Sequence, residues 1–314
     1  MGLLVRDLRF VRGIHSLAPI RPSPVDVSRG NTSSSRSRAV TFELPYLEAP
    51  SFSRAQSLVH ISQVSQHLER TGLLKVTLGF PDYDSNYLKQ LLLGLHKHCN
   101  HQLPISHSAT RGWFWDVRPS ATSFQAVNHQ ARSETMNEFP WHTDCSYEDP
   151  PPRFFALQIL QHDRFGGGTL SVMNVERLVQ QLSSTILASL KAPEYLVTIP
   201  PEFIKNTNRR CIIGSVLATD HDSSPMIRFR EDILSPLTER ARRALEELKK
   251  ALATKEVQAY STLHLSSDRL PKGSIILMDN RRWLHSRNHI NDPGRHLRRV
   301  RWDASPFNSS EKVV

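Results

Sequence analysis

Two residues that can bind a metal lie two positions apart in the stretch FPWHTDCSYEDPPP, which covers residues 139–152. In an extended strand, side chains two positions apart point to the same face, so His142 and Asp144 would present an imidazole and a carboxylate side by side. A third ligand would complete a two-histidine, one-carboxylate facial triad, which leaves adjacent positions open on non-haem iron. His67 and Glu69 share this spacing, but they lie in a helical pattern, where residues two apart do not face each other.

The third ligand is expected far along the chain, on a neighbouring strand. His285 follows the apolar run SIILM and a turn-forming Asp279-Asn280 pair. His289 and His296 lie close behind it and remain alternative ligands. A lone histidine is more often a satisfied polar residue of intermediate burial. The case for His285 therefore depends on the residues that accompany it.

Two arginines accompany His285 along the chain. Arg295 follows it by ten residues and Arg299 by fourteen. On an extended segment both side chains would lean to one face, and arginine binds a carboxylate through two parallel hydrogen bonds. The alternative is a solvated or nucleic-acid-binding basic patch, because further arginines surround them at positions 281, 282, 287, 298 and 301. No aromatic stacking platforms lie near this run, so nucleic-acid binding is not expected.

A glycine-rich turn provides one more candidate group. In RFGGGTLSVMN, the glycines at 166–168 allow a tight turn, and Thr169 places a hydroxyl at the start of a strand. A glycine triplet alone usually indicates only a hairpin. Here Thr169 lies 25 residues after Asp144, so the ordered set of candidates is more specific than any of its members.

The elements that must position these residues are mainly strands. Two amphipathic helices are expected near the start of the globular part, one running into Gly72 and one over residues 86–99, and a third over residues 236–253 carries Leu237, Leu245 and Leu248 on one stripe. Short segments rich in β-branched and aromatic residues, broken by Pro, Gly and Asn, predict strands. These segments are FFALQIL (154–160), GTLSVMNV (168–175), EYLVTIP (194–200) and GSIILMDN (273–280).

The composition is that of an ordinary globular protein of 314 residues, with 39% hydrophobic and 22% charged residues. No apolar run reaches the roughly 18 residues that a membrane span needs. Cys99, Cys145 and Cys211 are too few and too scattered for a disulfide framework. The net charge of +10 is concentrated at one end, because residues 1–40 contribute about half of the excess.

Residues 1–40 differ from the rest of the chain. They are rich in arginine and serine, and Leu4, Leu8 and Val11 recur at helical spacing among arginines. This pattern is typical of a mitochondrial transit peptide followed by a flexible arm. The alternative is a basic tail without an address, which would leave the protein cytoplasmic. We expect a single catalytic domain over residues 41–314.

The ordered set His142, Asp144, Thr169, His285 and Arg295 resembles the motif of the taurine dioxygenase/clavaminate synthase superfamily of iron(II)- and 2-oxoglutarate-dependent dioxygenases. The match covers roughly residues 65–305, and MDNRRWLHSR is similar to the segment around the distal histidine in the clavaminate synthase and amino-acid hydroxylase branch. The resemblance implies that both histidines and Asp144 bind iron. It implies that Thr169 and Arg295 hold the distal carboxylate of 2-oxoglutarate, with Arg299 near the co-substrate or the substrate's own anionic group. The spacing leaves Arg298 and Arg299 as alternatives to Arg295.

The resemblance also implies a fold and a reaction. The fold would be a double-stranded β-helix, or jelly roll, with the helices packed outside. The reaction would consume O2 and 2-oxoglutarate, release succinate and CO2, and hydroxylate a C–H bond of a small molecule, such as an amino acid or another small carboxylate. Desaturation and ring closure use the same ligands and stay open, whereas Asp144 argues against the halogenating variant.

The sequence signals for substrate contacts and for other functions are weaker. Asn128, Glu138, Arg228 and Arg230 are candidate substrate contacts, although the segment MIRFRED also fits a charged outward strand. One alternative function is an iron-dependent cupin-type dioxygenase without 2-oxoglutarate, which would have no use for Thr169 and Arg295. The other is a basic non-enzymatic binding protein. The expected partner is a small molecule, with neither nucleic acid nor membrane, and the sequence does not fix the oligomeric state.

Overall fold

The computed structural model describes residues 43–106, 112–120, 130–206 and 208–307. The chain from Thr41 to Val314 forms one compact unit. The expected basic arm at residues 1–40 lies outside the described residues, so its role as a transit peptide stays a prediction. Among the described residues, no helix has both the length and the apolar character needed to cross a membrane. Cys99, Cys145 and Cys211 are free thiols.

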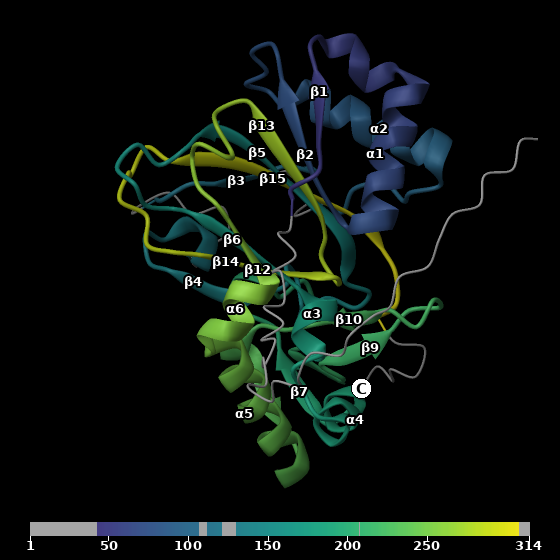
Figure 1. Ribbon diagram of the computed structural model, residues 1–314, viewed down its shortest axis with the longest axis vertical. Coiled ribbons are helices and arrows are strands. Elements are labelled where there is room, and N and C mark those ends of the chain that lie inside the picture. The colour runs from purple at the N-terminus through teal and green to yellow at the C-terminus, as the bar shows by residue number, and fades with distance from the viewer. Residues whose placement is uncertain (1–42, 107–111, 121–129, 207, 308–314) are drawn as a thin grey trace, which may run out of the picture. The chain divides into compact units, whose positions relative to one another are not determined.

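The site is carried by two sheets that pack face to face (Figure 1). In the larger sheet the order is β1-β2-β13-β5-β15-β3, and only β1 and β2 are parallel neighbours. Its strands are β1 (Tyr46–Ala49), β2 (Leu73–Leu78), β3 (Trp115–Val117), β5 (Pro152–Gln161), β13 (Ser274–Asp279) and β15 (His296–Ala304). The smaller antiparallel sheet has the order β12-β6-β14-β4, with β4 (Phe139–His142), β6 (Leu170–Asn174), β12 (Thr262–Leu265) and β14 (Trp283–Arg287).

The central strand β5 shows why the sheets stack. Its side chains alternate between faces, so Phe155, Leu157 and Ile159 enter the core between the sheets, while Phe154 and Ala156 enter the core under the helices. Both sets are almost completely buried. The expected fold class, mainly β with flanking helices and a jelly-roll core, is confirmed.

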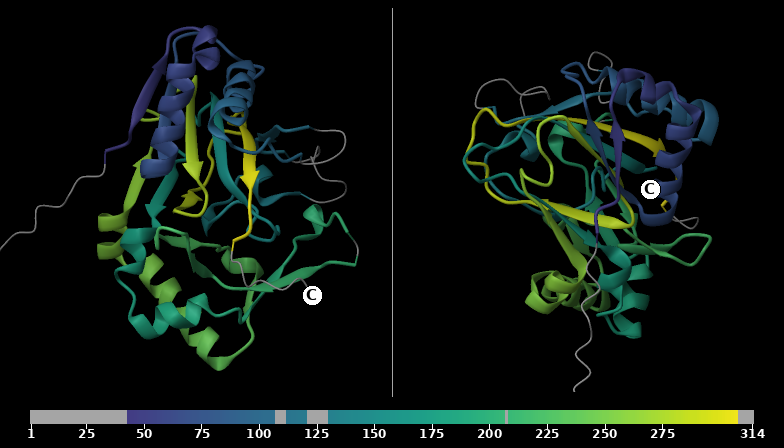
Figure 2. Two further views of the ribbon diagram at one scale, coloured as in Figure 1. Left: turned by 90° about the vertical axis from the view of Figure 1, so that its right-hand side faces the viewer. Right: turned by 45° about the horizontal axis from the view of Figure 1, so that its top comes forward.

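Two helices cover the outer face of the larger sheet (Figures 1 and 2). They are α1 (Leu58–Thr71) and α2 (Asn86–Cys99), close to the expected positions, and a 3-10 turn, Phe52–Gln56, precedes α1. Gly72 ends α1 in the left-handed conformation with φ of 67°, and a Cβ there would lie 3.0 Å from the Cβ of Asp279. Glycine therefore allows the turn from α1 into β2.

An insertion between β6 and β12 forms the third part of the fold, at the end opposite α1 and α2 (Figure 2). The helix that was expected over residues 236–253 is the longest one in this insertion and begins at Glu239. Thr238 is its N-cap, so Leu237 precedes the helix and is exposed. The predicted stripe is wrong at that position, and Ala241, Ala244, Leu245, Leu248 and Leu252 form the buried face. The insertion comprises α3 (Val175–Val179), α4 (Ser184–Lys191), β7 (Tyr195–Thr198), β8 (Cys211–Gly214), β9 (Leu217–Thr219), β10 (Pro225–Ile227), β11 (Leu234–Pro236), α5 (Glu239–Ala253) and α6 (Lys255–Ser261), with 3-10 turns at Pro201–Phe203 and Glu231–Ile233.

Candidate metal centre

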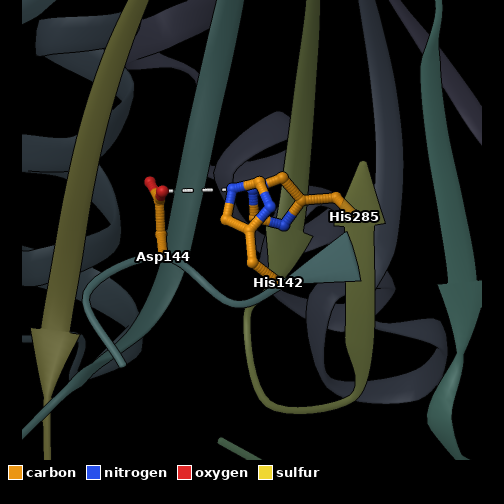
Figure 3. Close-up of side chains that lie close together, drawn as sticks. All are labelled: His142, Asp144 and His285. Carbon is orange, nitrogen blue, oxygen red and sulfur yellow. Dashed lines mark ion pairs between the residues drawn. The ribbon is translucent and has the colours of Figure 1, made fainter. Parts of the chain in front are cut away.

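The pairing of β4 with β14 brings the two candidate histidines together. His142 and His285 are direct cross-strand partners, and their ring centroids lie 4.0 Å apart. Figure 3 shows both rings facing the carboxylate of Asp144, and one ligand atom from each of the three residues lies within 4.8 Å of the others. All three side chains are buried. Residues that are 143 positions apart in the sequence thus form one group that could hold a metal ion.

Asp144 reaches the group in a way that differs from the expected strand. β4 ends at His142, and Asp144 lies in the turn that follows. The side chain of Asn280 fixes this turn, because its Oδ1 accepts from the backbone N–H of Asp144 at 2.7 Å and its Nδ2 donates to the carbonyl of Asp144 at 2.8 Å. Sequence reasoning treated Asn280 only as a turn residue and missed this role.

Both imidazoles are neutral and suited to bind a cation. Burial, together with the nearby His285, holds the pKa of His142 well below its usual value, and burial lowers the pKa of His285 to about 4. The Nδ1 of His142 donates to the carbonyl of Pro140 at 2.8 Å, because a carbonyl can only accept. The Nε2 lone pair of His142 is therefore left for a metal.

The carboxylate of Asp144 is ionised. Burial alone would raise its pKa, but the positive charge of Arg299 and further cationic groups outweigh burial and lower it. Its Oδ1 accepts from Nη1 of Arg299 at 3.0 Å and lies 3.9 Å from Nε2 of His285, whereas its buried Oδ2 has no hydrogen-bond partner among the described residues. A buried acceptor without a donor fits a bound cation.

The donor set of two neutral imidazoles and one carboxylate is that of a non-haem iron site. His289 is exposed, and Nε2 of His296 lies 2.9 Å from Oδ1 of Asp116, so neither alternative histidine joins the group. Within the described ranges, the triad is the one cluster of three or more such side chains in metal-binding reach. The residues present therefore fit Fe(II), with Asn280 and Arg299 supporting Asp144.

A cavity separate from the metal centre is lined by Thr169 and Arg295. Arg295 packs against the glycine turn, where a Cβ on Gly168 would come within 2.7 Å of its Nε. The guanidinium is buried, its Nη2 donates to the carbonyl of Gly168 at 3.3 Å, and its Nη1 has no partner among the described residues. Burial lowers the pKa of Arg295 to about 10, and the charge of Asp163 acts in the opposite direction. A buried cation with an unused donor fits a carboxylate ligand.

Asp163 ties the turn before Thr169 to the segment that carries Arg295. Its Oδ2 accepts from the backbone N–H groups of Asn291 at 2.7 Å and Asp292 at 3.1 Å, and its Oδ1 accepts from Phe165 at 2.8 Å. No pattern in the sequence singles out this residue. Its effect is to fix two loops that are about 130 residues apart around the cavity.

The three arginines that the spacing left open separate in the structure. Arg295 lies just before β15, and a bulge follows between His296 and Leu297. Arg298 points away from the core between the sheets, with its Nε 3.0 Å from Asp116, whereas Arg299 points to Asp144. Arg295 and Arg299 thus line different cavities at different points along the same segment. Arg298 lines neither cavity.

The reading of the remaining arginines as a solvated patch is wrong for most of them. Arg281, Arg287 and Arg301 are buried. Arg281 donates to the carbonyls of Pro151 and Ser305. Arg287 donates to the carbonyl of Thr135 at 3.2 Å, and burial lowers its pKa to about 9. Arg281 and Arg287 thus connect loops, and none of the three side chains faces solvent.

A cavity opens beside the metal centre. Arg230 lines it, so MIRFRED is not an outward-facing strand. Arg228 is buried over the ring of Phe307, and Glu138 is exposed and lines a separate groove, so neither lines this cavity. Asn128 lies outside the described residues. The lining residues are Ala131, Arg132, Ser133, Phe139, His142, Thr143, Asp144, Cys145, Tyr147, Phe203, Arg230, Arg299 and Arg301.

A jelly-roll core with a buried His-Asp-His group defines the class of protein. The family model described as taurine catabolism dioxygenase TauD, TfdA family matches residues 107–301. The chain belongs to this dioxygenase family.

Two curated relatives have amino acids in their names. The chain is 30% identical over 150 residues to an L-asparagine oxygenase of Streptomyces coelicolor, with 48% of this chain and 42% of that protein covered. It is 25% identical over 180 residues to an L-lysine 3-hydroxylase of Catenulispora acidiphila, with 56% and 46% covered. The match thus spans less than half of the length of either relative.

Solved structures share the fold. Asparagine oxygenase in complex with Fe(II), 3-hydroxyasparagine and succinate superposes with a TM-score of 0.61 at 20% identity, covering 80% of this chain and 79% of that one. The non-haem iron oxygenase OrfP in complex with iron and alpha-ketoglutaric acid gives a TM-score of 0.59 at 16% identity, covering 84% and 95%. At these identities the likeness establishes the fold.

Proposed function

We propose that this protein is an Fe(II)- and 2-oxoglutarate-dependent dioxygenase that hydroxylates a C–H bond of a small molecule. The observation that carries the proposal is the buried group of His142, Asp144 and His285 in a member of the TauD, TfdA family. The neutral imidazoles and the ionised carboxylate would hold Fe(II) and leave adjacent coordination positions open. When bound, iron and 2-oxoglutarate supply, with O2, the oxidation of the C–H bond and release succinate and CO2.

The cavity at Thr169 and Arg295 would bind the distal carboxylate of 2-oxoglutarate. A guanidinium makes two parallel charge-assisted hydrogen bonds to a carboxylate, and the Thr169 hydroxyl supplies a further donor. Asp163 and the glycine turn hold Arg295 in place. Arg299 would keep Asp144 ionised and oriented while the metal is bound.

The substrate would occupy the cavity beside the metal centre. Its aromatic walls, Phe139, Tyr147 and Phe203, would exclude water from the reacting bond. The names of the relatives support an amino acid or a similar small carboxylate as the substrate.

Oxygen consumption by the purified protein tests the proposal against the alternative functions. With a mixture of amino acids and small carboxylates as substrates, we expect uptake only when Fe(II) and 2-oxoglutarate are both present, with one succinate formed for each 2-oxoglutarate consumed. Oxygen uptake that needs iron but not 2-oxoglutarate would instead support a cupin-type dioxygenase. A basic binding protein would neither consume oxygen nor form succinate, and its affinity for its binding partner would fall steeply with salt.

We further propose that residues 1–40 direct the protein to mitochondria. The support is their composition, rich in arginine and serine and poor in acids. A reporter fused to residues 1–40 should enter mitochondria, whereas a purely cytosolic reporter would reject the address. The enzymatic proposal is independent of this result.

A further inference from the structure

The cavity beside the metal centre has an excess of positive charge. Arg132, Arg230, Arg299 and Arg301 line it, and the last three are buried. Arg299 and Arg301 project from β15, on the same face as Leu297 of the core between the sheets. Arg230 lies on the other side of the centre, where its backbone forms an isolated β-bridge with His142.

The acidic groups at this cavity are fewer than the arginines. Among its described lining residues, Asp144 is the one carboxylate, and it is the proposed iron ligand. Asp232 lies outside the lining, where it accepts two hydrogen bonds from Arg230 at 2.8 Å and lies 3.4 Å from Arg132.

The bound cofactors leave this excess in place. Fe(II) and the two carboxylates of 2-oxoglutarate cancel formally, so the side chains of the protein set the sign of the charge that a substrate meets. A cavity lined by one sign of charge attracts the opposite sign. A side-chain ammonium or guanidinium of a substrate would add to this excess and would find no free carboxylate among the described lining residues, and an unpaired buried charge is strongly unfavourable.

We propose that the substrate is a small acid with a second anionic group, such as the side-chain carboxylate of glutamate or aspartate, and that cationic side chains are rejected. This inference rests on the proposed function and adds the charge class of the substrate. One anionic group would lie on the β15 side of the centre at Arg299, and the other on the β4 side at Arg230. The relative named L-lysine 3-hydroxylase would differ from this chain in the charge of the side chain of its substrate.

Calorimetric binding under nitrogen tests the charge class without turnover. The full chain is loaded with Fe(II) and 2-oxoglutarate and titrated with the matched pairs glutamate and glutamine, and aspartate and asparagine, and with lysine and arginine. Within each pair the shape is constant and the charge changes. We expect one of the acids to bind about tenfold or more tighter than its amide, a difference of about 1.4 kcal/mol, and the two cationic amino acids not to bind.

A matched pair of variants tests the role of Arg230. Arg230→Gln should reduce the preference for the acid over its amide about tenfold, and Arg230→Lys should retain most of it, because only the first removes the charge. Arg298→Gln is the control, since it makes the same charge change on the opposite face of β15, where Arg298 pairs with Asp116. An Arg230→Gln protein with an unchanged acid preference contradicts the proposal.

The other outcomes are distinguishable. Tighter binding of an amide, lysine or arginine than of both acids overturns the inference, as does the failure of both acids to bind a protein that binds Fe(II) and 2-oxoglutarate. The proposed function survives either result, because it is tested by the iron and the co-substrate alone. A protein that binds neither Fe(II) nor 2-oxoglutarate overturns both.

Discussion

Nη1 of Arg299 lies 3.0 Å from Oδ1 of Asp144, and both side chains are buried. The positive charge of Arg299 thus acts directly on the carboxylate that we propose as an iron ligand, and it is the principal reason why the pKa of Asp144 is lowered despite burial. Hydrogen bonds of this kind orient a ligand before the metal arrives.

We predict that Arg299→Ala weakens Fe(II) binding about 10- to 100-fold, the usual effect of removing a partner that orients a metal ligand. Isothermal titration with Fe(II) under nitrogen measures this without turnover. Arg298→Ala is the matched control, because Arg298 pairs with Asp116 on the other face of the same strand. Equal Fe(II) affinities of the Arg299→Ala and Arg298→Ala proteins would remove Arg299 from the account of the metal centre.

Arg295→Ala should raise the 2-oxoglutarate concentration needed for half-maximal succinate formation by about thirtyfold or more, because truncating one partner of a buried charge pair typically costs roughly 2 to 5 kcal/mol. Arg295→Lys should restore little, since an ammonium cannot make two parallel hydrogen bonds to a carboxylate. Fe(II) affinity should stay near that of the wild type. If instead Arg298→Ala or Arg299→Ala abolishes 2-oxoglutarate binding and Arg295→Ala does not, the co-substrate anchor is misassigned.

Gly168→Ala should weaken 2-oxoglutarate binding in the same direction. A Cβ at this position would come within 2.7 Å of Nε of Arg295, and the backbone has a φ of +65°, which strains any residue with a side chain. Gly166→Ala is a control for strain alone, because its φ is +82° but no atom lies within 4 Å of the added Cβ. Titrations with 2-oxoglutarate that gave equal affinities for the two variants would show that contact with Arg295 is unimportant.

The sequence was sufficient to predict the strands and helices that hold the site. The alternation in FFALQIL and the apolar run before Asp279 predicted two strands of the core, and the left-handed turn at Gly72 followed from a helix that ends in glycine. The spacing of His142 and Asp144 indicated that these two side chains would meet, and the resemblance to the dioxygenase motif selected His285 over His289 and His296. These features depend on local patterns or on the pairing of neighbouring strands.

Contacts between distant loops could not be predicted in the same way. Asn280 holds Asp144 across 136 residues, Asp163 holds Asn291 across 128, and Arg299 reaches Asp144 across 155. No local periodicity marks the residues on either side of such a contact. The position of Leu237 outside the helix has a local cause, because Thr238 caps the helix and fixes its start one residue later.

Acid should destabilise the interface between α1 and α2 through His60. Burial, with a smaller effect of the charge of Arg54, lowers the pKa of His60 from 6.5 to about 4, and its Nε2 lies 2.6 Å from the hydroxyl of Tyr87. Between these pH values the unfolded chain binds a proton that the folded chain does not, so the free energy of unfolding should fall as the pH is lowered from 6.5 to 4.

Urea unfolding at both pH values checks this effect. The free energy of unfolding of the His60→Gln protein should fall less between pH 6.5 and pH 4 than that of the wild type, because glutamine does not titrate. His98→Gln, at an exposed position on α2, should behave as the wild type does. Identical losses in the wild-type and His60→Gln proteins would show that His60 is not the group responsible.

Fe(II) binding and succinate formation by the wild type and by His285→Ala test the central claim most directly. We predict that the wild type binds about one Fe(II) per chain and converts 2-oxoglutarate to succinate, and that His285→Ala does neither while keeping its fold by circular dichroism. His289→Ala should match the wild type, because His289 is exposed and lies outside the metal-binding group. A folded His285→Ala protein that binds Fe(II) and forms succinate as the wild type does would contradict the assignment of the metal centre.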